Sequence, residues 1–127
     1  MEKAVVLFVD DEADTVEAVK AGLEERSFTV LGATSAAEGL ELLRTLVPDI
    51  VVTDLRMSPM NGFDFFQAIR KLPAFRDTPV VFLTAVDDFL AEEYSETLGV
   101  DAYVTKPIDM ELLGETLRRH LKLRKPA

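Results

Sequence analysis

Five short apolar segments recur along the chain, and their spacing is the feature that most restricts its fold. They are AVVLFV at residues 4–9, FTVLGAT at 28–34, DIVVTD at 49–54, PVVFLTA at 79–85 and DAYVT at 101–105. The first is continuously apolar, which is typical of a strand buried on both faces. Each is followed by a stretch long enough for a helix, so the chain divides into five βα units of about 20 to 25 residues. This pattern predicts an α/β fold, a doubly wound, five-stranded parallel sheet with right-handed crossovers and five helices on its two faces.

Helical periodicity and local stop signals predict where the helices lie. We expect them at about residues 12–26, 35–47, 63–72, 88–98 and 109–123. Ser35 and Glu38 form a capping box at the start of the second helix. The apolar stripe of that helix consists of Ala36, Leu40, Leu43 and Val47. Pro48 and Pro73 end the second and third helices, because proline lacks an N–H and clashes with the preceding turn.

The composition excludes several functional classes. The 127 residues include no cysteine, so disulfides, thiolate metal ligands and a cysteine nucleophile are ruled out. The net charge of −9 disfavours direct binding of nucleic acid, which depends on clustered cations. No apolar run approaches the length of a membrane span or a signal peptide, so we expect a cytoplasmic protein without membrane contacts. We expect one domain over residues 1–123, with 124–127 as a tail or the start of a linker.

Polar side chains gather where the predicted strands end. Asp10 and Asp11 follow the first strand, and Asp54 ends the third. Thr84 lies near the end of the fourth strand, and Lys106 follows the fifth. Because the carboxyl ends of parallel strands meet at one edge of a sheet, we expect these side chains to converge.

This predicted cluster suits phosphate chemistry. Carboxylates without histidine or cysteine favour a hard cation, Mg²⁺ in particular, which is usually bound together with phosphate oxygens. Asp54 is then the candidate nucleophile for an acyl phosphate. Lys106 and Thr84 are candidate partners of the phosphate oxygens, as a point charge and a hydrogen-bond donor.

Each of these residues also has an ordinary structural explanation. An acid pair after a strand commonly caps a helix and meets its positive N-terminal dipole. An Asp at a strand end is often a loop cap, and a Lys-Pro pair is common in turns. The joint arrangement at four strand ends favours the phosphate site over these separate roles.

The strand-end motifs, taken in order, resemble the receiver domain of two-component response regulators. They are VDDE (9–12), PDIVVTDLRM (48–57), MNG (60–62), PVVFLTA (79–85) and DAYVTKP (101–107). The resemblance covers essentially the whole chain and implies the flavodoxin-like strand order 2-1-3-4-5. One departure follows the methionine of DLRM, where the family commonly has proline. Here Ser58 stands at that position and Pro59 follows, so we expect a local change in the loop.

For the acceptor site, the resemblance implies that Asp54 receives the phosphoryl group. Mg²⁺ would be held by Asp10, Asp11 and Asp54. The backbone carbonyl of Arg56 would complete the protein ligands of the metal. Lys106 would contact the phosphoryl group.

For the switch, the resemblance implies that Thr84 moves its hydroxyl towards the phosphoryl oxygens. Tyr103 would then turn from an outward to an inward position. The peptide bond between Lys106 and Pro107 would be cis. These changes would alter the surface formed by the fourth helix, the fifth strand and the fifth helix.

The resemblance also implies a function and a set of partners. The protein would be a regulatory phospho-acceptor in a phosphorelay, catalysing its own phosphorylation and slow autodephosphorylation rather than conventional turnover. A histidine kinase or phosphotransfer protein would donate the phosphoryl group, and an effector protein or output domain would respond. The protein would be a monomer or a phosphorylation-dependent dimer.

Three other classes remain as alternatives. A phosphorylation-independent pseudo-receiver would typically lack one of the acids, the threonine or the lysine, all of which are present here. A phosphohydrolase of the haloacid-dehalogenase kind needs a second acid two residues after its nucleophile, where this chain has Arg56. A nucleotide-binding Rossmann domain needs a glycine-rich first turn, where this chain has DDE at 10–12.

Overall fold

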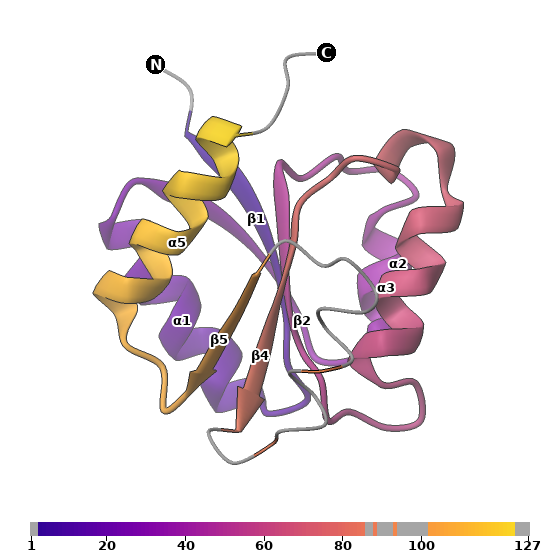
Figure 1. Cartoon of the computed structure of the whole chain (residues 1–127), viewed down its shortest axis with the longest axis horizontal. Helices are drawn as coiled ribbons and strands as arrows, with labels where there is room; N and C mark the ends of the chain where they lie inside the picture. Colours follow the sequence, from indigo (N-terminus) through magenta and orange to yellow (C-terminus); the bar gives the residue numbers. More distant parts are fainter. Residues whose placement is uncertain (1–2, 86–87, 89–92, 94–101, 124–127) are drawn as a thin grey trace.

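A parallel sheet with helices on both faces forms the structure, and its carboxyl ends define one edge of the molecule (Figure 1). The computed structural model describes residues 3–85, 88, 93 and 102–123. The sheet has five strands in the order β2-β1-β3-β4-β5, and all neighbouring pairs are parallel. The predicted fold class and strand order are therefore confirmed.

The strands agree closely with the apolar segments of the sequence. They are β1 (Ala4–Val9), β2 (Phe28–Ala33), β3 (Ile50–Asp54), β4 (Val80–Ala85) and β5 (Ala102–Lys106). Asp54 ends β3 as expected, and it lies opposite Leu83 of β4. Lys106 is the last residue of β5 and pairs with Ala85, whereas the sequence placed it just after the strand. Ladder pairing with β4 extends the strand by this residue.

Four α-helices lie within the described part of the chain. They are α1 (Ala13–Glu25), α2 (Ala36–Leu42), α3 (Gly62–Lys71) and α5 (Met110–Leu123), and a 3₁₀ turn, η1, covers Pro73–Phe75. Helices α1 and α5 cover one face of the sheet, and α2 and α3 cover the other (Figure 1). None of the helices in the described residues is long and apolar enough to cross a membrane. Most of the predicted helix at 88–98 lies outside the described residues, as does Asp101 of the predicted fifth strand.

Two apolar clusters hold the helices to the sheet. On the α1/α5 face, Leu23 and Leu113 pack with strand residues such as Phe8. On the α2/α3 face, Phe65 packs with strand residues such as Phe82. All five of these side chains are fully buried. Removing this much apolar surface from water is the main favourable contribution to folding, so the sheet and its strand-end edge are firmly supported.

Helix α2 is shorter than the sequence predicts. It ends at Leu42, and Val47, which we expected on its inward stripe, is 69% exposed. Proline disfavours the helical conformation of the residue before it, so Pro48 removes Val47 from the helix. On the inner side of α2, Gly39 packs closely against Phe65. A Cβ at position 39 would lie only 2.8 Å from the Phe65 ring.

Side-chain caps define the first residues of three helices, α2, α3 and α5. The predicted capping box of α2 is present, since Ser35 Oγ accepts a hydrogen bond from the Glu38 N–H at 3.0 Å. The Glu38 carboxylate accepts from the N–H of Thr34, one residue before the cap. Asn61 caps α3 and Asp109 caps α5 through their side-chain oxygens. Such caps satisfy N–H groups that a helix cannot bond internally.

Candidate functional site

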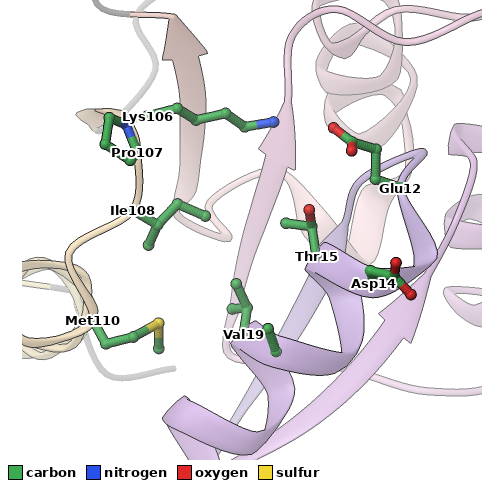
Figure 2. Close-up of a pocket in the computed structure, with 9 residues that line it drawn as sticks. Glu12, Asp14, Thr15, Val19, Lys106, Pro107, Ile108 and Met110 are labelled. Atoms are coloured by element: carbon green, nitrogen blue, oxygen red, sulfur yellow. The ribbon is translucent and has the colours of Figure 1, made fainter.

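A pocket opens at the carboxyl-end edge, between α1 and the segment that follows β5 (Figure 2). Its volume is about 440 Å³. Val19, Ile108 and Met110 form its apolar wall, and Glu12 and Lys106 bring charge to its border (Figure 2). An apolar hollow therefore adjoins the charged strand ends.

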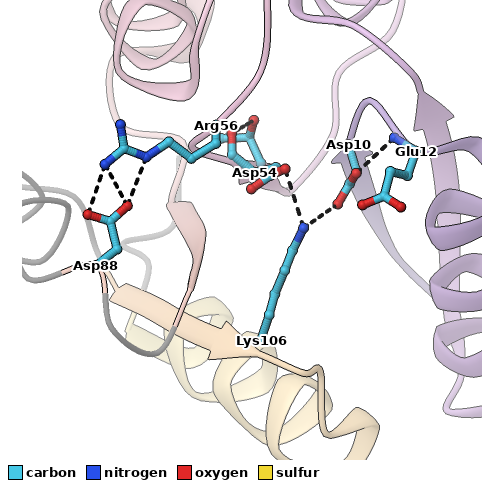
Figure 3. A network of polar contacts seen from close by, with 7 residues as sticks. Asp10, Glu12, Asp54, Arg56, Asp88 and Lys106 are labelled. Carbon is cyan, nitrogen blue, oxygen red and sulfur yellow. Dashed lines mark hydrogen bonds and ion pairs between the residues drawn. The ribbon is translucent and has the colours of Figure 1, made fainter.

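The ammonium group of Lys106 joins two buried carboxylates at these strand ends (Figure 3). Its Nζ lies 3.0 Å from Asp10 Oδ2 and 3.3 Å from Asp54 Oδ2. Asp10 is 0% exposed and Asp54 is 6% exposed, whereas the lysine side chain is 29% exposed. Two like charges this close to each other repel strongly away from water, and the shared cation offsets that repulsion.

The backbone around Asp10 fixes its carboxylate in place. Its own N–H donates to the carbonyl of Ala33 at the end of β2. Its Oδ1 accepts the N–H of Glu12 at 2.9 Å, leaving Oδ2 for Lys106. The two oxygens of one carboxylate thus connect the start of α1 with the end of β5.

The Asp54 carboxylate is held in a less favourable environment. Burial raises the pKa of this carboxyl above its ordinary value, and the nearby charge of Asp10 acts in the same direction. The charge of Lys106 and hydrogen bonds from Lys106 and the Arg56 backbone N–H partly oppose this rise in pKa. A carboxylate that is poorly solvated, yet retained beside a cation, is suited to act as a nucleophile.

Lys106 is correspondingly held in its charged form. Burial lowers the pKa of the ammonium, but the hydrogen bond to Asp10 and the charges of Asp54 and Asp10 outweigh this effect. The pKa of Lys106 therefore stands above its ordinary value. The lysine can accordingly act as a fixed positive charge for an anionic group at Asp54.

Asp10, Asp11 and Glu12 form a group of successive acids in which Asp10 is buried and the other two are exposed to solvent. One carboxylate oxygen from each of Asp10, Asp11 and Glu12 lies within 4.8 Å of the others. Glu12 begins α1 as expected, yet its side chain caps no N–H and instead adds to this acidic group. Asp54 is not part of the group, and Lys106 links it to Asp10. The donors are all carboxylate oxygens, a set that suits a hard divalent cation.

The predicted switch residues lie on neighbouring strands. Thr84 is 1% exposed, and no hydrogen-bond partner for its Oγ1 lies among the described residues. Tyr103 of β5 is half-buried and packs against the apolar cluster on the α2/α3 face. A buried hydroxyl that lacks a hydrogen-bond partner is costly to folding.

The loop between β3 and α3 approaches the acceptor strand closely. The Gly62 N–H donates to the carbonyl of Leu55, and a Cβ at Gly62 would lie 2.5 Å from the Asp54 carbonyl oxygen. Only glycine fits this approach. The Ser58–Pro59 bond, in the loop where the sequence departs from the family pattern, is cis, as is the Lys106–Pro107 bond.

An ion pair that the sequence did not reveal spans two loops of the site (Figure 3). The Arg56 guanidinium donates through Nε and Nη2 to the two carboxylate oxygens of Asp88, at 2.8 and 2.9 Å. The sequence predicts Arg56 as a carbonyl ligand of the metal, places it at the position of a dehalogenase's second acid, and places Asp88 at the start of a helix. The two residues are 32 positions apart, and no local pattern indicates that they meet.

Comparisons with known proteins agree with this geometry. A family model described as the response regulator receiver domain matches residues 6–118. The transcriptional regulatory protein YvrH of Bacillus subtilis is 35% identical over 123 residues, which cover 96% of this chain and 51% of YvrH. Protein PilH of Pseudomonas aeruginosa is 34% identical over 117 residues, which cover 90% of this chain and 94% of PilH. The chain therefore spans about half the length of YvrH and most of PilH.

The solved structures lead to the same family. The chemotaxis response regulator CheY4 of Vibrio cholerae is 28% identical and superposes with a TM-score of 0.86, covering 93% of this chain and 98% of CheY4. With the family model spanning nearly the whole sequence, the chain belongs to the receiver domains of two-component response regulators.

Proposed function

We propose that the protein is a phosphorylation-controlled switch in which Asp54 accepts a phosphoryl group from a histidine kinase or a phosphotransfer protein. The observation that carries this proposal is the Lys106 ammonium, which bridges the buried carboxylates of Asp10 and Asp54. It supplies a fixed positive charge at the acceptor, where the anionic group would arrive. Electrostatic positioning of this kind is the main requirement of phosphoryl transfer.

The reaction is a displacement at phosphorus. An Asp54 carboxylate oxygen attacks the phosphorus of a phosphohistidine, so that a P–O bond forms and the P–N bond breaks. The imidazole nitrogen that leaves takes a proton, and Asp54 becomes an acyl phosphate. Lys106 Nζ, 3.3 Å from Asp54 Oδ2, is close enough to pair with an oxygen of the transferred group.

We further propose that the site takes Mg²⁺. Asp10, Asp11 and Asp54 would hold it, together with the backbone carbonyl of Arg56. The all-oxygen donor set of the acidic group fits this ion, and Glu12 lies within the same group. When bound, Mg²⁺ supplies positive charge that neutralises the carboxylates and the phosphoryl oxygens.

The switch would act through Thr84 and Tyr103. The Thr84 hydroxyl, which has no partner among the described residues, would donate to a phosphoryl oxygen. Its movement would free space that the half-buried Tyr103 can occupy. The surface of β5 and α5 would thereby change its affinity for an effector protein or output domain. The predicted helix at 88–98, which we expect to complete this surface, lies mostly outside the described residues.

The apolar pocket supports the proposal of a protein donor. Val19, Ile108 and Met110 offer an apolar contact area directly beside Lys106. A docking partner that fills it would bring its phosphorylated side chain near the strand ends and exclude water from the transfer. Apolar contact at the centre and charge at the border is the usual composition of such interfaces.

The test is Mg²⁺-dependent labelling by a small phosphodonor such as acetyl phosphate or phosphoramidate, followed by intact mass. We expect the wild type to gain one phosphoryl group and Asp54→Asn to gain none. Equal labelling of the two proteins would show that Asp54 is not the acceptor. A wild type that stays unlabelled with Mg²⁺ would favour the pseudo-receiver alternative, an interaction module that works without phosphorylation.

The metal ligands have a matched control within the same acidic group. Asp10→Asn and Asp11→Asn should weaken Mg²⁺ binding, measured by calorimetry, and slow labelling together. Glu12→Gln removes the same charge one position along and should change both far less. If Mg²⁺ affinity survives the Asp10 and Asp11 changes, these acids are not metal ligands.

A further inference from the structure

The ion pair between Arg56 and Asp88 ties together the two loops that flank the acceptor (Figure 3). Arg56 belongs to the loop after β3, and Asp88 follows β4. The contact uses both the fork of the guanidinium and both carboxylate oxygens, with distances of 2.8 and 2.9 Å. A bidentate pair of this geometry fixes orientation as well as distance.

Each partner is also connected to a residue of the proposed reaction. The backbone N–H of Arg56 hydrogen-bonds the Asp54 carboxylate, so the same residue contacts the acceptor and Asp88. The N–H of Asp88 donates to the carbonyl of Ala85, the residue that follows Thr84. The ion pair therefore links the residue next to the acceptor carboxylate with the backbone of Ala85, directly after the switch residue.

The pair is asymmetric in its exposure. The Arg56 side chain is 68% exposed, whereas the Asp88 side chain is only 11% exposed. The guanidinium can therefore leave towards solvent at little cost, while the carboxylate stays in place.

We propose that the Arg56–Asp88 ion pair is a latch that stabilises the unphosphorylated arrangement of the two loops and opposes the movement of Thr84 towards Asp54. This inference rests on the proposed phospho-acceptor function of Asp54. Arg56 and Asp88 act in it as positioning residues. A contact present in one arrangement and lost in the other shifts the equilibrium between them by its own free energy.

Two substitutions distinguish the latch from a simple charge effect, because the two explanations predict different signs for the change in anion affinity. Beryllium fluoride binds carboxylates as an analogue of a phosphoryl group, and its affinity with Mg²⁺ present can be measured by calorimetry or ¹⁹F NMR. Arg56→Ala removes a positive charge and Asp88→Asn removes a negative one. Long-range electrostatics alone would make the first variant bind this anion more weakly and the second more tightly.

The latch predicts instead that both variants change in the same direction. Each should bind beryllium fluoride about two- to fivefold more tightly than the wild type, the range expected for an ion pair with one exposed partner. The double variant should match the single variants, because the latch can be broken only once. Arg56→Ala keeps the backbone N–H that Asp54 uses, so the acceptor itself is retained.

Two controls complete the design. The exchanged variant Arg56→Asp with Asp88→Arg restores an ion pair and should return the affinity towards the wild-type value. Arg44→Ala breaks a different exposed ion pair, with Glu41 on α2, and should leave the affinity unchanged. Urea unfolding of every variant shows that the folded state is retained.

The outcomes separate the latch from the function on which it rests. A wild type that binds no beryllium fluoride, or binds it as Asp54→Asn does, overturns the proposed function and the latch together. The latch alone is overturned if the wild type binds beryllium fluoride through Asp54 but the affinities of the two single variants change in opposite directions or do not change. It is also overturned if the two changes in affinity add in the double variant.

Discussion

Replacing Lys106 by methionine tests the electrostatics of the strand-end cluster most directly. Methionine keeps much of the aliphatic volume and removes the ammonium that lies 3.0 Å from Asp10 Oδ2 and 3.3 Å from Asp54 Oδ2. The side chain of Asp10, which is fully buried, then keeps only the Glu12 N–H as a partner among the residues that the structure describes. Two carboxylates are left close together in a poorly solvated position.

The expected cost follows from the burial of the three groups. Removing one partner of a fully buried pair costs about 3 to 5 kcal/mol, and breaking an exposed pair costs about 0.2 to 1 kcal/mol. The lysine side chain is 29% exposed and its two partners are almost entirely buried, so we expect an intermediate loss of about 2 to 3 kcal/mol. In an Asp54→Asn background the same change should cost less, since Asp10 alone loses its cation.

The assay is urea unfolding at neutral pH with EDTA, repeated with Mg²⁺. We expect added Mg²⁺ to reduce the difference between wild type and Lys106→Met, because a divalent cation would neutralise the same acids. Lys20→Met, an exposed lysine on α1, is the control and should stay within about 0.5 kcal/mol of wild type. A loss below about 1 kcal/mol for Lys106→Met would refute the view that the ammonium offsets carboxylate repulsion.

The pH dependence of this difference has a defined sign. The pKa of Lys106 is raised above its ordinary value of 10.5 in the folded protein. Its contribution to the free energy of unfolding is therefore fully present below pH 10.5 and is lost as the pH rises through the folded-state pKa. The wild type should lose this advantage over Lys106→Met only in alkaline solution, and a loss near neutral pH would contradict the assignment.

Five further substitutions have expected outcomes that urea unfolding can measure. Asp54→Asn should raise the free energy of unfolding at pH 7, because burial raises the pKa of Asp54 and so disfavours its charged form in the folded protein. This gain should vanish as the pH falls below 3.8, the ordinary pKa of the group. A destabilised variant would contradict the prediction. Gly62→Ala, whose Cβ would lie 2.5 Å from a backbone oxygen, should cost about 3 kcal/mol. Gly114→Ala, whose Cβ would find its nearest neighbour at 3.4 Å, should stabilise α5 by up to about 1 kcal/mol, and equal effects at the two glycines would be inconsistent with the structure. Phe65→Ala should cost about 3 to 5 kcal/mol, whereas Val47→Ala at an exposed position should be nearly neutral.

Much of the fold could be predicted from local patterns. The central strands β1, β3 and β4 are nearly continuous apolar runs because both of their faces are covered, and this left a signal in each of these segments. Helix starts at Ser35 and Asn61 carry side-chain caps, which depend only on residues three positions apart. The end of α2 was predicted too late, at Val47 rather than Leu42, because the apolar period continued after the helix had ended.

The candidate site could be predicted as a group of residues but not as a geometry. Strand-end position is enough to bring Asp10, Asp54 and Lys106 to one edge, given a parallel sheet. It does not say that the lysine bridges both acids, nor that Glu12 joins the acidic group while beginning α1. Those details depend on side-chain rotamers and on the path of the loops.

The sequence by itself therefore determined the order of strands and helices, the edge at which the chemistry lies and the residue types available there. Only the tertiary structure decided which of them pair. The Thr84 hydroxyl is left without a partner among the described residues, and Arg56 finds Asp88 across 32 positions. The physical reason is that periodicity and capping are local, whereas an ion pair between two loops depends on the packed arrangement of the strands that carry them.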